Sequence, residues 1–238
     1  VGRSGSATAG ARPVRFDGVR TPTAIDGIAD DYTRKLAALN PLTATDLGIV
    51  GDDHLVGDWS PAGHAARADL ARDTVRALDA ADPADETDRV TRAAMRERLA
   101  LEVELFEAGE YKADLNVIAS LPQALRDVLD LMPTETEAQW RSIAERIAGI
   151  PDAIDGYIAC LTEGIASGPM PAKRQCDEVA KQADELADPA TSFFVTFCAG
   201  ATPDGAPATG ELAEALTAAG AAAAASYGKL ATFLREGL

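Results

Sequence analysis

Apolar side chains recur along most of the chain at spacings of three and four residues, the period of an α-helix with one buried face. No segment shows the sustained alternation that is typical of a half-buried β-strand. The pattern therefore predicts an all-α fold, an array of about seven to nine helices. The predicted helical ranges are 23–39, 41–50, 60–82, 85–108, 122–131, 134–150, 151–168, 173–186 and 211–238.

Local chemistry specifies several helix boundaries. Asn40 precedes a proline, and a residue in that position avoids the α region, so the first helix is predicted to end there. Ser60 also precedes a proline and is expected to cap the N-terminus of the next long helix. Thr134 and Glu137 have the spacing of a capping box. The short acidic connector at 82–85 predicts an antiparallel hairpin of the two helices that flank it.

Composition supports the same fold class. About a fifth of the 238 residues are alanine, and only 5% are aromatic. Alanine is the strongest intrinsic helix former, whereas strands favour β-branched and aromatic residues. At this length the chain can bury a core without disulfides or metals. No linker divides residues 23–238, which are therefore expected to form one helical domain.

The charge balance limits the partners of the chain. With 22 Lys and Arg against 38 Asp and Glu, the net charge is −16. Nucleic-acid binding requires clustered basic residues, and anionic membrane surfaces attract them as well. We therefore expect neither partner. No apolar run approaches the roughly 18 to 20 residues of a transmembrane helix, so no membrane span is predicted.

Cysteine usage and the N-terminal segment bear on location. Cys160, Cys176 and Cys198 are widely spaced and form no Cys-x-x-Cys pair, so they are predicted to be small buried side chains rather than zinc ligands. A reducing, cytoplasmic location is expected. Residues 1–22 are rich in Gly, Ser, Ala and Arg, lack a signal-peptide core, and are predicted to be a flexible leader.

Candidate chemistry is sparse. The sequence has no His-Glu-x-x-His, nucleophile-elbow, Walker or dinucleotide-binding motif. His54 and His64 are interpreted as surface or capping histidines. Asp52, Asp53 and Asp58 cluster with His54, and such a loop could hold a hard cation, but turn and capping chemistry explains these aspartates better. No catalytic, cofactor-binding or metal-ligating residue is assigned.

Two further groups are interpreted as structural. Phe193, Phe194 and Phe197 form an aromatic cluster that is expected to pack in the core rather than to line a ligand pocket. The charged residues within 96–104 are expected to form a solvated helix face.

Several segments together resemble a bacterial family known as domain of unknown function 885. Asn-Pro-Leu-Thr-Ala-Thr-Asp-Leu-Gly at 40–48 and the Asp-rich loop with its Ser-Pro helix start at 52–61 resemble the opening of that family. Leu-Pro-Gln-Ala-Leu at 121–125 and Gly-Ile-Ala-Ser-Gly-Pro-Met-Pro-Ala-Lys-Arg-Gln at 164–175 are similar to its next segments. With the last helix, the resemblance covers about residues 24–238.

The resemblance implies a zinc metallopeptidase-like hydrolase of carboxypeptidase or dipeptidase type, with a His-Glu-x-x-His helix in the second half of longer relatives. No position in this sequence matches that motif. The chain thus resembles the N-terminal half only and is expected to be inactive alone, without zinc unless a C-terminal half is present. Whether this protein is an enzyme stays open.

The implied partners are a C-terminal catalytic half or a second copy, joined through the last helix. A large exposed apolar patch on that helix is expected if an interface has been left uncovered. The alternative is a non-catalytic helical binding or scaffold protein, with a polar or self-associating last helix. A third hypothesis is an unrelated helical enzyme that uses the Asp52-Asp53-His54 loop.

Overall fold

The computed structural model describes residues 20–237, and within that range it contains helices, turns and loops but no strand. The all-α prediction is confirmed. Seven helices have 12 residues or more: α1 (Ala24–Leu39), α3 (Pro61–Ala80), α4 (Glu86–Ala108), α6 (Glu137–Ala148), α7 (Ile150–Ser167), α8 (Lys173–Ala187) and α10 (Gly210–Glu236). The short helices are α2 (Pro41–Asp46), α5 (Leu121–Asp127) and α9 (Phe193–Ala199), with 3-10 turns η1 (Glu110–Lys112), η2 (Val128–Leu131) and η3 (Pro203–Gly205).

Most helix starts lie where the sequence places them, with one capping box displaced. Ser60 caps α3, its side chain accepting from the Gly63 N–H. The capping box of α6 pairs Thr136 with Gln139, so the predicted pair at Thr134 was wrong by two residues. The Thr134 carbonyl instead accepts the indole N–H of Trp140 at 2.8 Å, and this bond holds Thr134 outside the helix.

The segment predicted as a helix over 41–50 ends earlier, at Asp46. Gly48 adopts a positive φ of 71°, and the Ile49 N–H turns back to bond the Ala44 carbonyl at 2.8 Å. This left-handed termination satisfies the last carbonyls of α2, which is the usual role of glycine after a helix.

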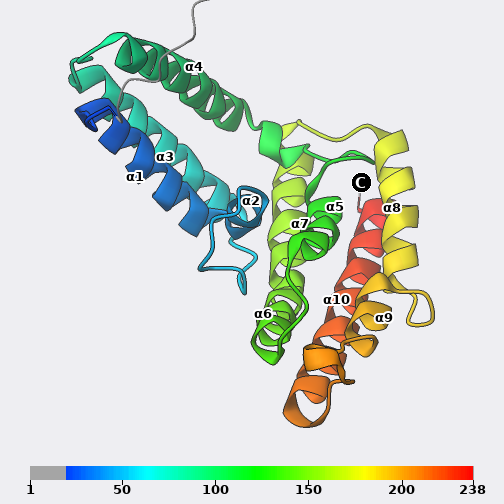
Figure 1. Cartoon of the computed structure of the whole chain (residues 1–238). Helices are drawn as coiled ribbons and strands as arrows, with labels where there is room; N and C mark the ends of the chain where they lie inside the picture. Colours follow the sequence, from blue (N-terminus) through cyan, green and yellow to red (C-terminus); the bar gives the residue numbers. More distant parts are fainter. Residues whose placement is uncertain (1–19, 238) are drawn as a thin grey trace, which may run out of the picture.

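The helices form two groups, which we call the arm and the bundle. The arm comprises α1, α3 and α4; α3 and α4 form the predicted antiparallel hairpin, and α1 packs along α3 (Figure 1). The arm has a narrow core with few buried apolar side chains: Ile25, Ala68, Ala71, Leu78 and Leu99. The bundle comprises α5 to α10 and contains most of the main hydrophobic core.

α10 is the central helix of the bundle, since it packs against α6, α7, α8 and α9. Its small residues permit close approach: a Cβ on Gly220 would lie 2.9 Å from the Phe194 carbonyl of α9. Its large apolar side chains, Leu216 and Tyr227 among them, are buried within the chain. Its exposed positions carry alanine and polar residues. The described part of α10 exposes no large apolar side chain, because these side chains are buried in the bundle's own core. The apolar patch expected for an uncovered interface is therefore not found on this helix.

A buried arginine joins the bundle to the segment that connects α1 and α3 of the arm. Arg146 of α6 is 1% exposed. It donates from Nε to the Leu55 carbonyl at 2.9 Å, and from Nη1 to Thr45 Oγ1 at 2.9 Å. Its Nη2 reaches the carbonyls of Asp52 at 3.3 Å and Pro41 at 3.5 Å. These bonds fix α2 and the loop that follows it against the bundle.

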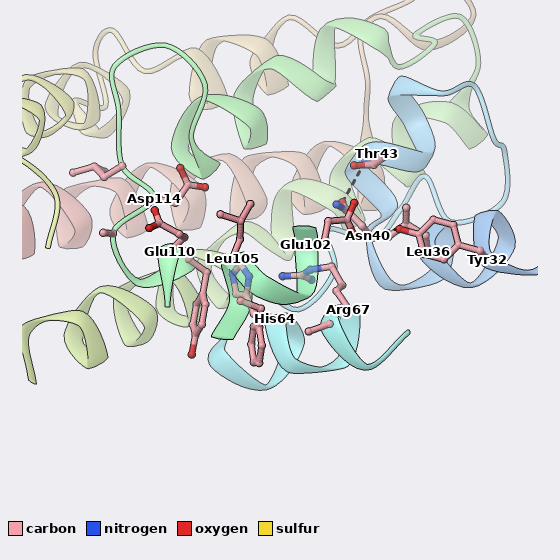
Figure 2. Close-up of a pocket in the computed structure, with 15 residues that line it drawn as sticks. Tyr32, Leu36, Asn40, Thr43, His64, Arg67, Glu102, Leu105, Glu110 and Asp114 are labelled. Atoms are coloured by element: carbon pink, nitrogen blue, oxygen red, sulfur yellow. Dashed lines mark hydrogen bonds between the residues drawn. The ribbon is translucent and has the colours of Figure 1, made fainter. Parts of the chain in front are cut away.

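Two cavities lie where the arm meets the bundle, and Figure 2 looks into the larger one. Within the part of the chain that the structure describes, no helix combines the length and the apolar character needed to cross a bilayer.

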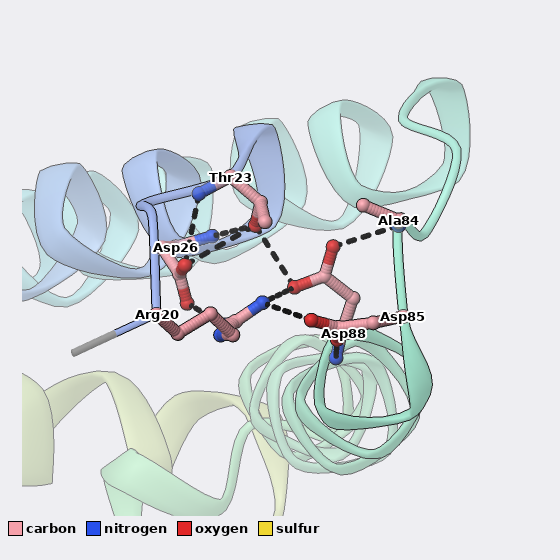
Figure 3. Close-up of polar contacts among 6 residues, drawn as sticks. All are labelled: Arg20, Thr23, Asp26, Ala84, Asp85 and Asp88. Atoms are coloured by element: carbon pink, nitrogen blue, oxygen red, sulfur yellow. Dashed lines mark hydrogen bonds and ion pairs between the residues drawn. The ribbon is translucent and has the colours of Figure 1, made fainter. Parts of the chain in front are cut away.

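A polar network fastens the start of α1 to the turn between α3 and α4 (Figure 3). Asp88 is fully buried and accepts bonds from Arg20 Nη1 at 2.7 Å, Thr23 Oγ1 at 2.8 Å and the Ala84 N–H at 2.8 Å. Arg20 also binds Asp85 at 2.9 Å. Arg20 belongs to the predicted leader, whose residues 1–19 lie outside the described part of the chain.

We predict that Asp88→Asn lowers the melting temperature at pH 7, because the buried partner of Arg20 loses its charge. Burial opposes ionisation of Asp88, but the bonds from Arg20, Ala84 and Thr23 outweigh it and hold its pKa below the ordinary 3.8. A lowered folded-state pKa contributes stability above the unfolded-state value, and this is lost as pH falls through the folded-state value.

Denaturant unfolding of both proteins between pH 7 and pH 2 checks this prediction. The difference in unfolding free energy should be constant above about pH 5 and shrink below about pH 4. Asp73→Asn is the matched control, since Asp73 is exposed and paired only with Arg76 on its own helix. If Asp88→Asn lowers the unfolding free energy by the same amount at every pH, Asp88 is not ionised in the folded chain and the prediction is contradicted.

Candidate ligand-binding cleft

The two cavities at the junction of arm and bundle adjoin one another. Their volumes are about 710 and 610 Å³, and both are lined by His64, Tyr111 and Asp114. We refer to the pair as the cleft. Cavities of 300 to 1,000 Å³ are of the size that binds small molecules and short peptides.

The arm supplies one wall of the cleft, and the start of the bundle supplies the other. Figure 2 shows side chains from α1, α3 and α4 around the first cavity, with Tyr32, Arg67 and Glu102 among them. The second cavity continues along α5 and η2 as far as Asp130 and Leu131. The walls therefore combine apolar surface with charged groups from several helices.

An aromatic stack forms the boundary between the two cavities. The ring of Tyr111 stacks on His64 with centroids 4.7 Å apart and on Phe106 at 5.3 Å, while Trp59 meets His64 edge-on at 6.1 Å. Desolvation, and next the positive charge of Arg67, lower the pKa of His64 to about 4, although the Asp58 carboxylate opposes the shift. His64 is thus a half-buried neutral imidazole, and its interpretation as a surface or capping residue was wrong.

Arg67 is the one lysine or arginine among the residues that line the cleft. Its Nη1 donates to the Asp58 backbone carbonyl at 2.8 Å, and its guanidinium lies 4.8 Å from the centre of the Trp59 ring. Its Nη2 is buried and has no acceptor. Burial lowers the pKa of Arg67, and the Asp58 carboxylate only partly offsets this effect.

The turn that holds Arg67 depends on two close approaches at glycine. A Cβ on Gly63 would lie 2.1 Å from the Asp58 carbonyl oxygen, and one on Gly156 would lie 2.7 Å from the Ser60 nitrogen. These glycines let the turn sit tightly between α3 and α7. The Asp58 carboxylate caps the turn by accepting the Ser60 N–H at 2.8 Å.

Three carboxylates face the first cavity: Glu102, Glu110 and Asp114. Desolvation raises the pKa of Asp114, and the negative charge of Glu110 adds to the shift. Desolvation also raises the pKa of Glu102, which accepts a long hydrogen bond from the Tyr32 hydroxyl at 3.4 Å. Among the described residues, no lysine or arginine lies within ion-pair distance of these three carboxylates.

A short loop from the bundle forms the rim of the second cavity. The Asn116 side-chain oxygen accepts the N–H groups of Ile118 at 2.9 Å and Ala119 at 2.7 Å, so the loop turns sharply. Gln175 and Gln182 of α8 bond the two backbone groups of Val117. The turn leaves Ile118 80% exposed at the edge of the cleft.

The thiol of Cys160 does not supply a nucleophile to the cleft. Cys160 lies close beneath it, but its thiol is fully buried and bonds the Trp59 carbonyl at 3.3 Å. Desolvation raises the pKa of this thiol to about 12, so it stays protonated at neutral pH. A protonated, sealed thiol is a poor nucleophile. The cleft is lined by charged groups, aromatic rings and apolar side chains.

The other residues considered in the sequence lie outside the cleft or support the fold. His54 lines a separate cavity of about 400 Å³, and the Asp53 carboxylate accepts the Thr45 hydroxyl at 3.2 Å. The prediction of buried cysteines is confirmed for all three. Phe194 is a core residue, whereas Phe193 is only partly buried and lies beneath the guanidinium of Arg126.

The donor set does not fit a zinc ion. Within residues 20–237, no three His, Cys, Asp or Glu side chains are grouped so that they could hold a metal. His54 and His64 line different cavities, and the three thiols are buried. This chain's described residues therefore offer no place for the zinc that the resemblance implies.

Sequence reasoning missed the residues that the fold brings together here. His64 and Arg67 are one helical turn apart at the start of α3, so a shared face could have been read from their spacing. Tyr111 and Asp114 follow Gly109, whose φ of 80° ends α4 and turns the chain towards the bundle. Nothing in the sequence around this turn indicates which residues Tyr111 and Asp114 will face in the fold.

The fold and the cleft together define an all-α protein with a cleft between a helical arm and a helical bundle. The family model described as bacterial protein of unknown function (DUF885) matches residues 41–238, which is most of the chain. The chain therefore belongs to this family. The match begins at α2 and leaves out the part of the noted resemblance that precedes residue 41. A search of curated proteins returned no match.

We predict that the imidazole of His64 titrates with a pKa of about 4, and that Tyr111→Leu moves it towards the ordinary 6.5 by admitting water. NMR titration of a His54→Gln background, in which one imidazole remains, checks this prediction. Because the folded-state pKa is lowered, protonation favours the unfolded state. His64 should therefore reduce stability as pH falls from 6.5 to about 4, with no further effect below. A wild-type pKa near 6.5 would contradict the desolvated stack.

Proposed function

We propose that this chain is the N-terminal, substrate-binding part of a zinc metallopeptidase-like hydrolase, and that the cleft holds the peptide. Membership in the family supports this proposal, together with the carboxypeptidase or dipeptidase type of hydrolase that the family resemblance implies. The observation that carries it is the cleft itself, which places apolar walls and charges of both signs around a space of peptide size. Peptides present the same combination, with charged ends and apolar side chains.

The catalytic metal is not proposed for this chain. Because the described donor set does not fit zinc, we propose that any zinc ligands come from residues outside this sequence, and that the chain alone hydrolyses no peptide. The role of the chain is then to bind and orient the substrate. The exposed side chains at the rim of the cleft, Ile118 and Leu131, are available to a catalytic part that completes the site.

Calorimetric titration with short apolar peptides, combined with zinc analysis, tests the proposal. We expect the purified chain to bind such peptides, to contain far less than one zinc per chain, and to release no amino acid from them. Ala113→Trp should weaken binding by about tenfold or more, because the new ring fills the first cavity. Ala100→Trp is the matched control, on an exposed position of α4 outside the cleft.

Either of two outcomes contradicts this proposal. The first is the absence of any peptide binding, or binding that Ala113→Trp does not weaken. The second is one tightly bound zinc per chain whose removal abolishes peptide hydrolysis, which would place the whole activity in this sequence.

A second candidate function is a non-catalytic helical binding protein. One observation favours it: the exposed face of α10 carries alanine, polar and charged residues, and no large apolar side chain of this helix is exposed. An interface that has lost its partner would be expected to expose such side chains. Under this alternative, the cleft binds its ligand and no catalytic part joins it.

Size-exclusion chromatography with light scattering separates the two candidates. Under the metallopeptidase proposal, we predict that the chain forms a stable one-to-one complex with a co-expressed polypeptide that is encoded downstream and carries a His-Glu-x-x-His motif. Ile118→Asp at the rim should weaken that complex, and Ala100→Asp on α4 should not. A chain that stays monomeric with every such polypeptide favours the binding protein.

A further inference from the structure

The cleft keeps opposite charges apart instead of pairing them. Arg67 lines the first cavity together with Glu102, Glu110 and Asp114, yet within the described residues it forms no ion pair with any carboxylate. Other arginines of this chain of net charge −16, such as Arg72 and Arg126, each bind two carboxylates.

The guanidinium of Arg67 is anchored on one side and unpaired on the other. The Asp58 carbonyl occupies Nη1, and the Trp59 ring supports the guanidinium plane. Nη2 has no acceptor, although a buried donor without a partner costs free energy. The side chain as a whole is only half-buried and lines the cavity. Because Nη2 itself is shielded from solvent, a ligand gains this donor when the guanidinium turns towards the cavity. A carboxylate is the strongest acceptor for a guanidinium.

The anionic side of the cavity is also held in position without a partner. The Asp114 backbone is fixed, because its carbonyl accepts the Tyr157 hydroxyl of α7 at 2.5 Å. Its carboxylate projects into the space shared by both cavities, beside Glu110. Desolvation and the charge of Glu110 both raise the pKa of Asp114, and the positive charge of an ammonium group bound at this point offsets them.

We propose that the cleft recognises short zwitterionic peptides by both ends, with Arg67 receiving the ligand's terminal carboxylate and Asp114 receiving its ammonium group. Tyr111 and His64 lie between the two walls and present aromatic surface to the side chains of the bound peptide. The inference rests on the proposed function and deepens it. It names short peptides with free ends as the substrate class and two residues as determinants of that specificity.

The test uses one apolar peptide sequence, two to four leucines long, in four forms: free at both ends, acetylated, amidated, and masked at both ends. Dissociation constants are measured by calorimetry at pH 7 and low salt. For the wild-type chain, we expect masking of either end to weaken binding by about tenfold or more, as loss of a charge-assisted hydrogen bond implies.

Each variant should remove sensitivity to one end only. Arg67→Gln should make amidation irrelevant while acetylation still weakens binding, and Asp114→Asn should show the reverse pattern. Glu104→Gln is the matched control, since Glu104 is an exposed residue of α4 that does not line the cleft. Thermal melts establish that each variant is folded. If Arg67→Gln does not fold, Arg67→Lys, which keeps the charge but not the forked donor, should reduce the effect of amidation.

The outcomes distinguish this inference from the proposed function. Equal affinity of the wild-type chain for the free and doubly masked peptides overturns the inference and leaves the peptide cleft standing. So does a loss of affinity in Arg67→Gln that is the same for free and amidated peptides, since it would report a structural role alone. Failure of all four peptides to bind overturns the proposed function itself.

Discussion

The arrangement of arm and bundle depends on the hydrogen bonds that the Arg146 guanidinium donates. A charge with 1% exposure must find partners inside the protein, and it finds them in four oxygens of α2 and the loop behind it. Burial lowers the pKa of this arginine, while the nearby Asp53 and Asp46 counter the shift, and an arginine stays charged regardless. Because one side chain satisfies so many acceptors, the loop has little freedom to move against the bundle.

That constraint extends from the loop to the cleft through backbone contacts. The loop ends in Trp59, whose indole N–H bonds the Val56 carbonyl at 2.8 Å and whose own carbonyl accepts the Cys160 thiol. Trp59 in turn supports Arg67 and meets His64 edge-on. The position of the cation in the cleft is therefore set by a residue of α6 that does not line either cavity of the cleft. A substitution that disturbs the Arg146 contacts is therefore expected to change the lining of the cleft as well as the fold.

Local sequence rules predict much of this fold and little of its cleft. Helix periodicity and capping at Ser60 depend on residues a few positions apart, so they can be read directly. Thr136 and Gln139 have the same capping-box spacing as Thr134 and Glu137, so the sequence allows two starts for α6. The bond from the Trp140 indole to the Thr134 carbonyl accompanies the later start, and the bundle decides where that indole lies. Arg67 lies on α3 and Asp114 in the loop after η1, and nothing local encodes that they line the same cavity. His64 was misread for the same reason, since burial comes from Tyr111 and Trp59.

The central place of α10 also dictates an order of assembly. The arm consists of helices that contact near neighbours in sequence, so it can form as soon as Ala108 has been synthesised. The bundle cannot, because α6, α7, α8 and α9 all pack on a helix that follows them. Until α10 emerges, the apolar faces of these helices stay uncovered, and such surfaces are what chaperones bind and aggregates recruit. An alanine-rich helix suits that position, since it forms rapidly on its own and is ready to dock.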